Sequence, residues 1–420
     1  MLINKLRHKF SGQYIRNIGW MGGAEFANRI FRLGTTIVIS RAFSPYDYGL
    51  VAVVLTTNEI ANVFTLRGGI SSKLIQASKE DVDILSDTAY WMNWILCIAL
   101  FIIQCLAAFP IAWFYGDNQV ILPICVIATV YLMLPLYAVQ GALIMRENRL
   151  NVVALCNVLQ SLTGNLLTII MAVFGMGMWA IVLPIVFTNP IWVIINLINH
   201  KWRPRKHFRL HRWREIAVFA LNLLGVEILN KLRGNLDYLI VGRFLGIDIL
   251  GIYYFAFNAG IGISLNVINS LTWSLFPHLC EIRENIKELK KRYYNSLKTM
   301  AFIIIPLVLL QSSLAPLYVP VVFGEKWIKA IPILMIICLS AIPRPFAEAA
   351  GQLLQAVDKT HLNLYWNVIF TVIFTICLLI VVKWGILSVA VSVLISHFIA
   401  LPIFTIWASK YVLRNRKIKA

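Results

Sequence analysis

A short charged motif that occurs twice, each time in a stretch apolar enough for a membrane, is the part of this sequence best suited to chemistry. Residues 23–29 read Gly-Ala-Glu-Phe-Ala-Asn-Arg, and residues 225–231 read Gly-Val-Glu-Ile-Leu-Asn-Lys, at an offset of 202 residues. In a helix, the Glu, the Asn and the basic residue of each motif share one face. An ionisable residue in a membrane helix costs about 2.5–3.5 kcal/mol and usually faces a protein interior or a water-filled path. A duplicated charged face of this kind indicates a transporter.

Other apolar segments also carry charged residues. Arginine suits phosphate because its planar fork donates two parallel hydrogen bonds. Some arginines remain without a carboxylate once the acidic and basic residues are paired, chiefly Arg32, Arg67 and Arg233. An anionic ligand would therefore depend on these. The further charged residues at membrane depth are Arg32, Glu59, Arg67, Arg233, Asp237, Arg344 and Glu348.

A structural interpretation of the same residues stays open. Charges spaced i,i+4 can form buried ion pairs that hold helices together. The two interpretations are compatible, because a charge that lines a cavity needs a partner whenever no ligand is bound. The pairs with this spacing are Glu25–Arg29, Glu227–Lys231 and Arg344–Glu348.

The composition indicates a multi-span membrane protein. Of 420 residues, 59% are hydrophobic and only 14% are charged, a balance outside the range of soluble globular proteins. Twelve segments are long enough to cross about 30 Å of hydrocarbon as helices, and Pro135 and Pro343 are among the prolines expected to kink them. The predicted spans are residues 17–40, 48–74, 87–109, 119–140, 152–174, 178–198, 216–240, 250–276, 299–320, 329–351, 362–382 and 386–408.

The distribution of Lys and Arg predicts that both termini are cytoplasmic. The basic excess of the inward loops also accounts for the net charge of +19. Its expected partners are anionic membrane lipids and not nucleic acid. With this orientation the outward loops hold five basic residues, namely Arg41, Arg243, Lys326, Lys329 and Lys383.

The repeated motif predicts that one membrane lobe has been duplicated. Gly116 and Gly324 correspond at an offset of 208, as do Gly177 and Gly385. Because six helices is an even number, the second lobe enters from the same side, and a pseudo-two-fold axis along the membrane normal should relate the lobes. The predicted divisions are an N-terminal lobe at 1–199, a basic cytoplasmic linker at 200–215, a C-terminal lobe at 216–409 and a basic tail at 410–420.

Several kinds of chemistry find no support in the sequence. No GxxxxGK[ST] loop is present, which excludes nucleotide hydrolysis by the Walker mechanism. The seven cysteines show no CxxC or Cys/His ligand spacing, so we expect neither a disulfide framework nor a metal site. The outward connections are too short for a catalytic domain. We therefore expect no enzyme and no cofactor, with transport driven by an ion gradient or by the gradient of the substrate.

Short stretches along the whole chain carry a family likeness. They are SRAFSPYDYG at 40–49, GISSKLIQ at 69–76, DYLIVGR at 237–243, LGIY at 250–253, Phe276-Pro277 and FGEKW at 323–327. Each stretch alone is loose, and their order and spacing provide the specificity. Together they resemble the polysaccharide exporter family, the Wzx-type flippases of the multidrug/oligosaccharidyl-lipid/polysaccharide (MOP) superfamily, nearest to its colanic-acid-type branch.

The resemblance implies an all-α, MATE-like fold of two six-helix lobes that works by alternating access. The implied substrate is an undecaprenyl-diphosphate-linked oligosaccharide repeat unit, moved across the bacterial cytoplasmic membrane for O-antigen, exopolysaccharide or capsule synthesis, with other polysaccharide-assembly membrane proteins as partners. Mapped onto this sequence, the candidates for the lipid diphosphate are Arg29, Arg32, Arg67, Lys231 and Arg233. The candidates for ion coupling or charge pairing are Glu25, Glu59, Glu227, Asp237, Arg344 and Glu348.

Three other functions compete with the flippase. A multidrug or ion antiporter of the same superfamily would want acidic residues to dominate its cavity, which Arg29, Arg32, Lys231, Arg233 and Arg344 argue against. A membrane-embedded sugar transferase would need larger external loops, and a scaffold without transport would leave the duplicated charges idle. The coupling ion stays open between H⁺, Na⁺ and none.

Overall fold

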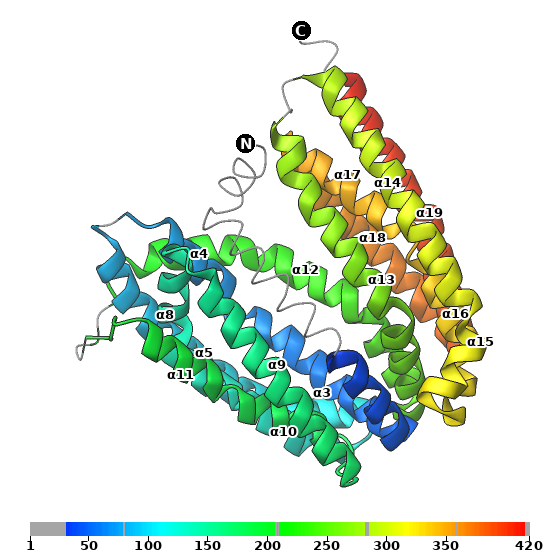
Figure 1. Ribbon diagram of the computed structural model, residues 1–420, viewed down its shortest axis with the longest axis horizontal. Helices are drawn as coiled ribbons and strands as arrows, with labels where there is room; N and C mark the ends of the chain where they lie inside the picture. The colour runs from blue at the N-terminus through cyan, green and yellow to red at the C-terminus, as the bar shows by residue number, and fades with distance from the viewer. Residues whose placement is uncertain are drawn as a thin grey trace, which may run out of the picture. The chain divides into compact units, whose positions relative to one another are not determined.

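The chain folds into helices that form two compact units, Met1–Leu232 and Arg233–Ala420. Every regular element in the described ranges is a helix. The computed structural model (Figure 1) describes residues 31–78, 80–205, 208, 210–281, 285–357 and 359–415.

The boundary between the units falls inside one long helix, α12 (Trp213–Leu245). The first turns of α12 pack on the preceding helices, because Ile216 and Ala220 belong to the same apolar core as Ile70 and Leu85. The predicted linker at 200–215 thus lies within the first unit as the structure divides the chain. The predicted lobe boundaries stay predictions.

The first unit begins, in its described part, with a helical segment at residues 31–42. Its next helix starts with a capping box, because the Ser44 hydroxyl accepts from the Asp47 N–H while the Asp47 carboxylate accepts from the Ser44 N–H. Pro45 then occupies the first helical position, where its missing N–H has no cost. The helices are α3 (Pro45–Val63), α4 (Arg67–Gln76), α5 (Val82–Tyr115), η1 (Asn118–Val120), α6 (Ile121–Ala128), α7 (Val130–Met133), α8 (Pro135–Arg146), α9 (Leu150–Val173), α10 (Trp179–Thr188), α11 (Pro190–Asn199) and the start of α12.

The second unit begins with the remainder of α12. An Asn285 side chain that accepts from the Glu288 N–H fixes the start of its third helix. The helices after α12 are α13 (Ile247–Glu281), α14 (Ile286–Ser313), α15 (Ala315–Tyr318), η2 (Val319–Phe323), η3 (Glu325–Ala330), α16 (Ile331–Ser340), α17 (Arg344–Ala356), α18 (Thr360–Val381), η4 (Val382–Trp384) and α19 (Ile386–Asn415).

The glycines paired by the offset of 208 share the sign of φ but not the whole backbone conformation, because Gly116 has ψ 23° and Gly324 has ψ 157°. Gly116 (φ 73°) follows α5 and Gly324 (φ 105°) follows η2, while Gly177 (φ 53°) and Gly385 (φ 97°) precede α10 and α19. All four lie at positive φ, which glycine adopts without the strain that a Cβ would cause. Positions that favour glycine therefore recur at this offset, and the duplication of a lobe stays a prediction.

One of the predicted kinks is present as a bend, and a second proline stands at an interruption between two helices. A bend of 52° separates the helical stretch Asn118–Met133 from α8, which starts at Pro135. Pro343 stands immediately before α17, after a break that follows α16. The two prolines are also 208 residues apart, so equivalent spans are broken at equivalent places.

Eight helical stretches of the described residues are long and apolar enough to cross a membrane, or nine if the bent pair is one span. The predicted number of twelve is not confirmed by this count. Helix α12 is not among the eight, and its four charged residues between Glu227 and Asp237 interrupt its apolar sequence. In α13 the apolar stretch is the shorter Ile247–Gly262, and the predicted span at 17–40 lies mostly outside the described residues.

The folded chain leaves many large apolar side chains uncovered. Phe302 is 83% exposed, Phe174 80% and Trp113 79%. Exposed apolar surface is a liability in water, whereas a lipid bilayer solvates it. The pattern is the one that a multi-span membrane protein requires.

Gly69 is needed where α4 crosses α12. A Cβ at Gly69 would lie 2.5 Å from the Ala220 Cα, so the two backbones would have to separate. We expect Gly69→Ala to destabilise the protein by about 1–3 kcal/mol, the usual effect of overpacking. Thermal unfolding in detergent measures this loss. Gly34→Ala is the control, because a Cβ there meets nothing within 4 Å; an equal loss in both variants would contradict the close contact.

Candidate functional site

The break between α3 and α4 leaves the N-terminus of α4 inside a membrane span, Pro45–Gln76. Leu66 takes φ 53° and provides no side-chain cap. The Arg67 N–H donates to the Thr65 hydroxyl at 3.3 Å, and Gly68 and Gly69 complete the first turn without side chains. A helix N-terminus carries a partial positive charge of roughly half a unit. The turn is therefore suited to an anionic group.

Arg67 is the first residue of α4, and its guanidinium lies over two aromatic rings. Its central carbon is 5.3 Å from the Tyr137 ring centroid and 5.5 Å from the Trp192 ring centroid. Both distances are in the cation–π range. Within the described residues no carboxylate forms an ion pair with Arg67. Arg67, one of the residues predicted to bind the diphosphate, is thus a half-buried cation. The rings stabilise its charge without neutralising it.

Lys231 forms an ion pair with Glu59, from α3, at 3.0 Å. The side chains are 48% and 50% exposed, so we rate the pair as weak, worth about 0–1 kcal/mol. Glu227, one turn before Lys231 on α12, places a carboxylate oxygen 3.2 Å from where a Cβ on Gly68 would stand. The structure therefore gathers Glu59 and Lys231 into one pair and brings Glu227 to the start of α4.

The other candidate site residues of α12, Arg233 and Asp237, belong to the second unit. Arg233 donates to the Asn367 side-chain oxygen, and the Asn367 amide donates to the Asn363 oxygen at 3.3 Å. Asp237 is only 5% exposed and accepts from the Tyr253 hydroxyl at 2.8 Å and from the Tyr238 N–H at 3.0 Å. Hydrogen bonds of this kind compensate for the burial of the carboxylate.

Arg344 starts α17 as Arg67 starts α4. Its guanidinium lies 5.8 Å from the Phe257 ring centroid, and its buried Nε has no hydrogen-bond partner among the described residues. Glu348 is exposed one turn further on, and these two described side chains make no ion pair with each other. The spacing i,i+4 was therefore not sufficient to form this pair.

The structure gives no contact that assigns a role to the other candidate site residues. Arg32 is exposed on the helical segment 31–42, and Glu25 and Arg29 lie outside the described residues. The sequence analysis did not single out Tyr137 and Trp192, whose rings contact Arg67. Aromatic residues in apolar helices are usually ordinary packing residues, so nothing in the sequence marked these two. Among the described residues no group of three or more His, Cys, Asp or Glu could hold a metal ion.

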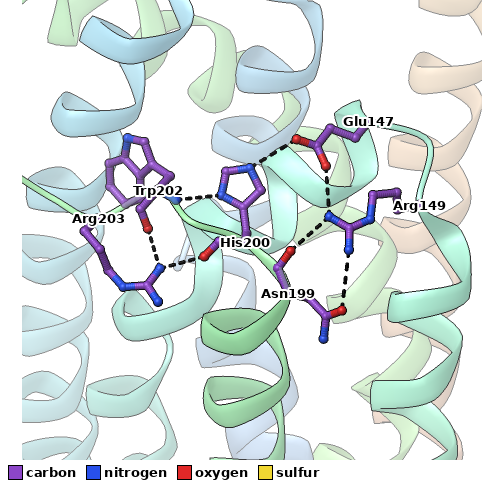
Figure 2. A network of polar contacts seen from close by, with 6 residues as sticks. All are labelled: Glu147, Arg149, Asn199, His200, Trp202 and Arg203. Atoms are coloured by element: carbon purple, nitrogen blue, oxygen red, sulfur yellow. Dashed lines mark hydrogen bonds and ion pairs between the residues drawn. The ribbon is translucent and has the colours of Figure 1, made fainter.

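A second polar network joins the connection between α8 and α9 to the end of α11 (Figure 2). The Arg149 guanidinium donates to the Asn199 carbonyl at 2.9 Å and to Glu147 at 3.1 Å. The Nδ1 of His200 accepts from the Trp202 N–H at 3.1 Å, which leaves Nε2 as the protonated nitrogen facing Glu147 at 3.3 Å. The network anchors the start of the basic linker rather than forming a ligand site.

Ion pairs also fix the end of this linker. Arg212 contacts Asp81 at 2.5 Å and Glu215 at 2.7 Å, and Lys73 contacts Glu215 at 2.6 Å. The Ser78 hydroxyl, and then Arg212, hold the pKa of Asp81 below its ordinary value of 3.8. Lys73, and then Arg212, hold the pKa of Glu215 below 4.5. These four charged residues join the α4–α5 connection to the start of α12.

Comparison with solved structures defines the class of protein. The fold is similar to an inward-facing multidrug resistance MATE family transporter of the MOP superfamily, with a TM-score of 0.74 and 16% identity over 94% of this chain and 96% of that one. It is also similar to the lipid II flippase MurJ in an inward closed conformation, with a TM-score of 0.75 and 13% identity over 93% and 87%. The protein is an all-α, multi-span membrane protein with the MATE- and MurJ-like fold, as predicted.

Sequence comparison narrows this class. The polysaccharide biosynthesis protein family matches residues 38–332, so the chain belongs to this family. An uncharacterized membrane protein in the cps region of Klebsiella pneumoniae is 26% identical over 409 residues, 96% of this chain and 83% of that protein. The lipopolysaccharide biosynthesis protein WzxC of Escherichia coli (strain K12) is 27% identical over 340 residues, 80% and 68%. The predicted resemblance and the prediction of a bacterial transporter rather than an enzyme are confirmed.

The linker ion pairs predict how stability depends on pH. A carboxyl whose pKa is lowered by folding contributes stability above its unfolded pKa, and this contribution is lost as the pH falls through its folded pKa. We therefore expect the stability advantage of the wild type over Asp81→Asn/Glu215→Gln to be constant near neutrality. It should disappear as the pH falls through 4.5 and then below 3.8. Thermal unfolding in detergent over this pH range measures the advantage; one that grew on acidification would contradict the lowered pKa values.

Proposed function

We propose that the protein exports undecaprenyl-diphosphate-linked oligosaccharide repeat units across the bacterial cytoplasmic membrane, by alternating access, for surface polysaccharide synthesis. Its family and its flippase-like fold support transport of a lipid-linked glycan. The observation that carries the proposal is Arg67, a cation at the start of a broken membrane helix without a described carboxylate partner. A diphosphate is the part of such a substrate that this arrangement recognises.

The first turn of α4 has three properties that favour a phosphate. The helix N-terminus provides a positive potential, and the exposed Gly68 has no side chain that would keep an oxygen from its backbone amide. Arg67 adds a permanently charged fork that can donate two parallel hydrogen bonds. Broken membrane helices whose half-helix N-termini face an anionic group are a known transporter device.

Lys231 can supply a second cation in this proposal. Its ion pair with Glu59 is half-exposed, so exchanging the carboxylate for a phosphate loses little energy. Glu227 carries like charge to the phosphate and lies beside Gly68. We therefore assign Arg67 and Lys231 to the diphosphate, with Arg29 and Arg32 as further ligands, and Glu25, Glu59 and Glu227 to charge pairing or ion coupling.

The second unit contributes a separate set of charges. Asp237 is held by Tyr253 and by the Tyr238 N–H, whereas Glu348 is exposed. We assign Asp237, Arg344 and Glu348 to ion coupling or charge pairing, with H⁺ or Na⁺ as the ion. Arg233, bonded to Asn367, stays a candidate for the diphosphate.

The alternative function is a multidrug or ion antiporter of the same superfamily. The similarity of the fold to the MATE transporter favours it. A cation exporter would need a carboxylate where the structure has Arg67 with aromatic neighbours. The local charge at α4 therefore supports the export of an anionic substrate.

Removal of one cation tests the proposal. We expect Arg67→Ala and Lys231→Ala each to lower export about 10- to 100-fold, because a hydrogen bond to a charged group contributes about 1.5–3 kcal/mol. Surface polysaccharide is measured in a strain whose chromosomal copy is replaced by each variant, together with the amount of protein in the membrane.

The matched control is Lys298→Ala, which removes an exposed cation from α14. It should export at the wild-type level. Normal polysaccharide in both Arg67→Ala and Lys231→Ala would refute the site, and accumulation of a drug substrate in place of polysaccharide loss would favour the antiporter.

The proposed orientation, with both termini cytoplasmic, has its own test. Reporters are fused after Arg205, in the basic linker, and after Lys326, in a predicted outward loop. We expect alkaline phosphatase to be active only after Lys326 and green fluorescent protein to fluoresce only after Arg205, because the positive-inside rule places the linker in the cytoplasm. The opposite pattern would reverse every side assigned above.

A further inference from the structure

The surroundings of Arg67 form a built support rather than a loose contact. The Tyr137 and Trp192 rings are 5.6 Å apart between centroids and are inclined at 35°, and the guanidinium is almost equally far from both. Tyr137 comes from α8 and Trp192 from α11. Two helices distant in sequence thus meet on one side chain of α4.

Hydrogen bonds fix the helices that carry these rings. The Trp192 indole N–H donates to the Gln160 side-chain oxygen, from α9, at 2.7 Å. On α8, Arg146 donates to the carbonyls of Leu74 and Ile75, both at 3.0 Å. Helix α8 therefore contacts α4 near both ends, through Tyr137 at the start and Arg146 at the finish.

An aromatic contact makes fewer demands on the N–H donors of a guanidinium than an ion pair does. A cation–π contact uses the charge of the group without requiring its N–H donors, whereas an ion pair with a carboxylate uses both charge and donors. A guanidinium held by rings keeps the fork that a phosphate needs. A lysine in its place would lack the planar fork.

We propose that Tyr137, Trp192 and Gln160 are positioning residues that hold the Arg67 fork ready for the diphosphate of the substrate. The inference rests on the proposed function and adds to it the side chains that determine the affinity of Arg67. Gln160 acts through Trp192, whose ring orientation it fixes. None of the three carries a charge, so their effect on an anionic ligand passes through Arg67.

Binding of a simple lipid diphosphate to the purified full-length protein in nanodiscs tests the inference. Farnesyl diphosphate is titrated by calorimetry against wild type, Arg67→Ala, Trp192→Leu and Gln160→Leu. We expect Trp192→Leu to bind about 5- to 30-fold more weakly, the upper range of a cation–π contact away from water. Gln160→Leu should show a smaller loss, and Trp192→Phe, which keeps a ring, should recover part of the affinity.

A double variant separates positioning from general packing. In the Arg67→Ala background, the further change Trp192→Leu should have no effect, because the cation that the ring positions is absent. The control Trp94→Leu removes a partly buried tryptophan of α5 that contacts Tyr90, and it should bind like the wild type.

The outcomes distinguish the two proposals. Weak binding by Arg67→Ala together with wild-type binding by Trp192→Leu would overturn the positioning role and leave the proposed function intact. An undiminished Trp192→Leu loss in the Arg67→Ala background would also overturn it, since the ring would then act by packing. Wild-type binding by Arg67→Ala would refute the site itself. If Trp192→Leu does not fold, Gln160→Leu and Trp192→Phe decide in the same way.

Discussion

The proposed site depends on how the charge of Arg67, at the start of α4 in a candidate membrane span, is compensated. An unsupported charge at that depth costs about 2.5–3.5 kcal/mol, and a carboxylate partner would remove the attraction for an anion. The rings of Tyr137 and Trp192 offer an intermediate solution, because they stabilise the Arg67 guanidinium without neutralising it. Because the helix breaks before α4, Arg67 stands at a helix N-terminus. The partial positive charge of this N-terminus adds to that of the guanidinium.

Helix α12 shows that burial decides how each charge is compensated. Lys231 is half-exposed and pairs with Glu59, a contact that is weak in polar surroundings and easily exchanged. Asp237 is buried and is held by a tyrosine hydroxyl and a backbone amide, which are lost only at a high cost. Charges six residues apart on one helix are thus suited to different tasks, ligand exchange and fixed structure.

The sequence was sufficient for features that depend on local geometry. Apolar length predicted helices, and the glycines at 116, 177, 324 and 385, which the sequence paired by their offset, all lie at positive φ. The sequence did not predict which side chains of different helices contact each other. Lys231 meets Glu59, 172 residues away, while Arg67 meets rings from α8 and α11. Periodicity describes one helix face, whereas these contacts depend on how helices pack.

Turns and charges differ in how strictly the predicted duplication pairs them. A position at positive φ admits few residues, so glycine recurs at the offset of 208. A charged side chain needs only some compensating partner, and rings, amides, hydroxyls and carboxylates all serve. Arg67 and Arg344 therefore both start a half-helix beside aromatic rings although the offset does not relate them. At both positions an aromatic ring stabilises the cation without neutralising it, so its attraction for an anion is kept.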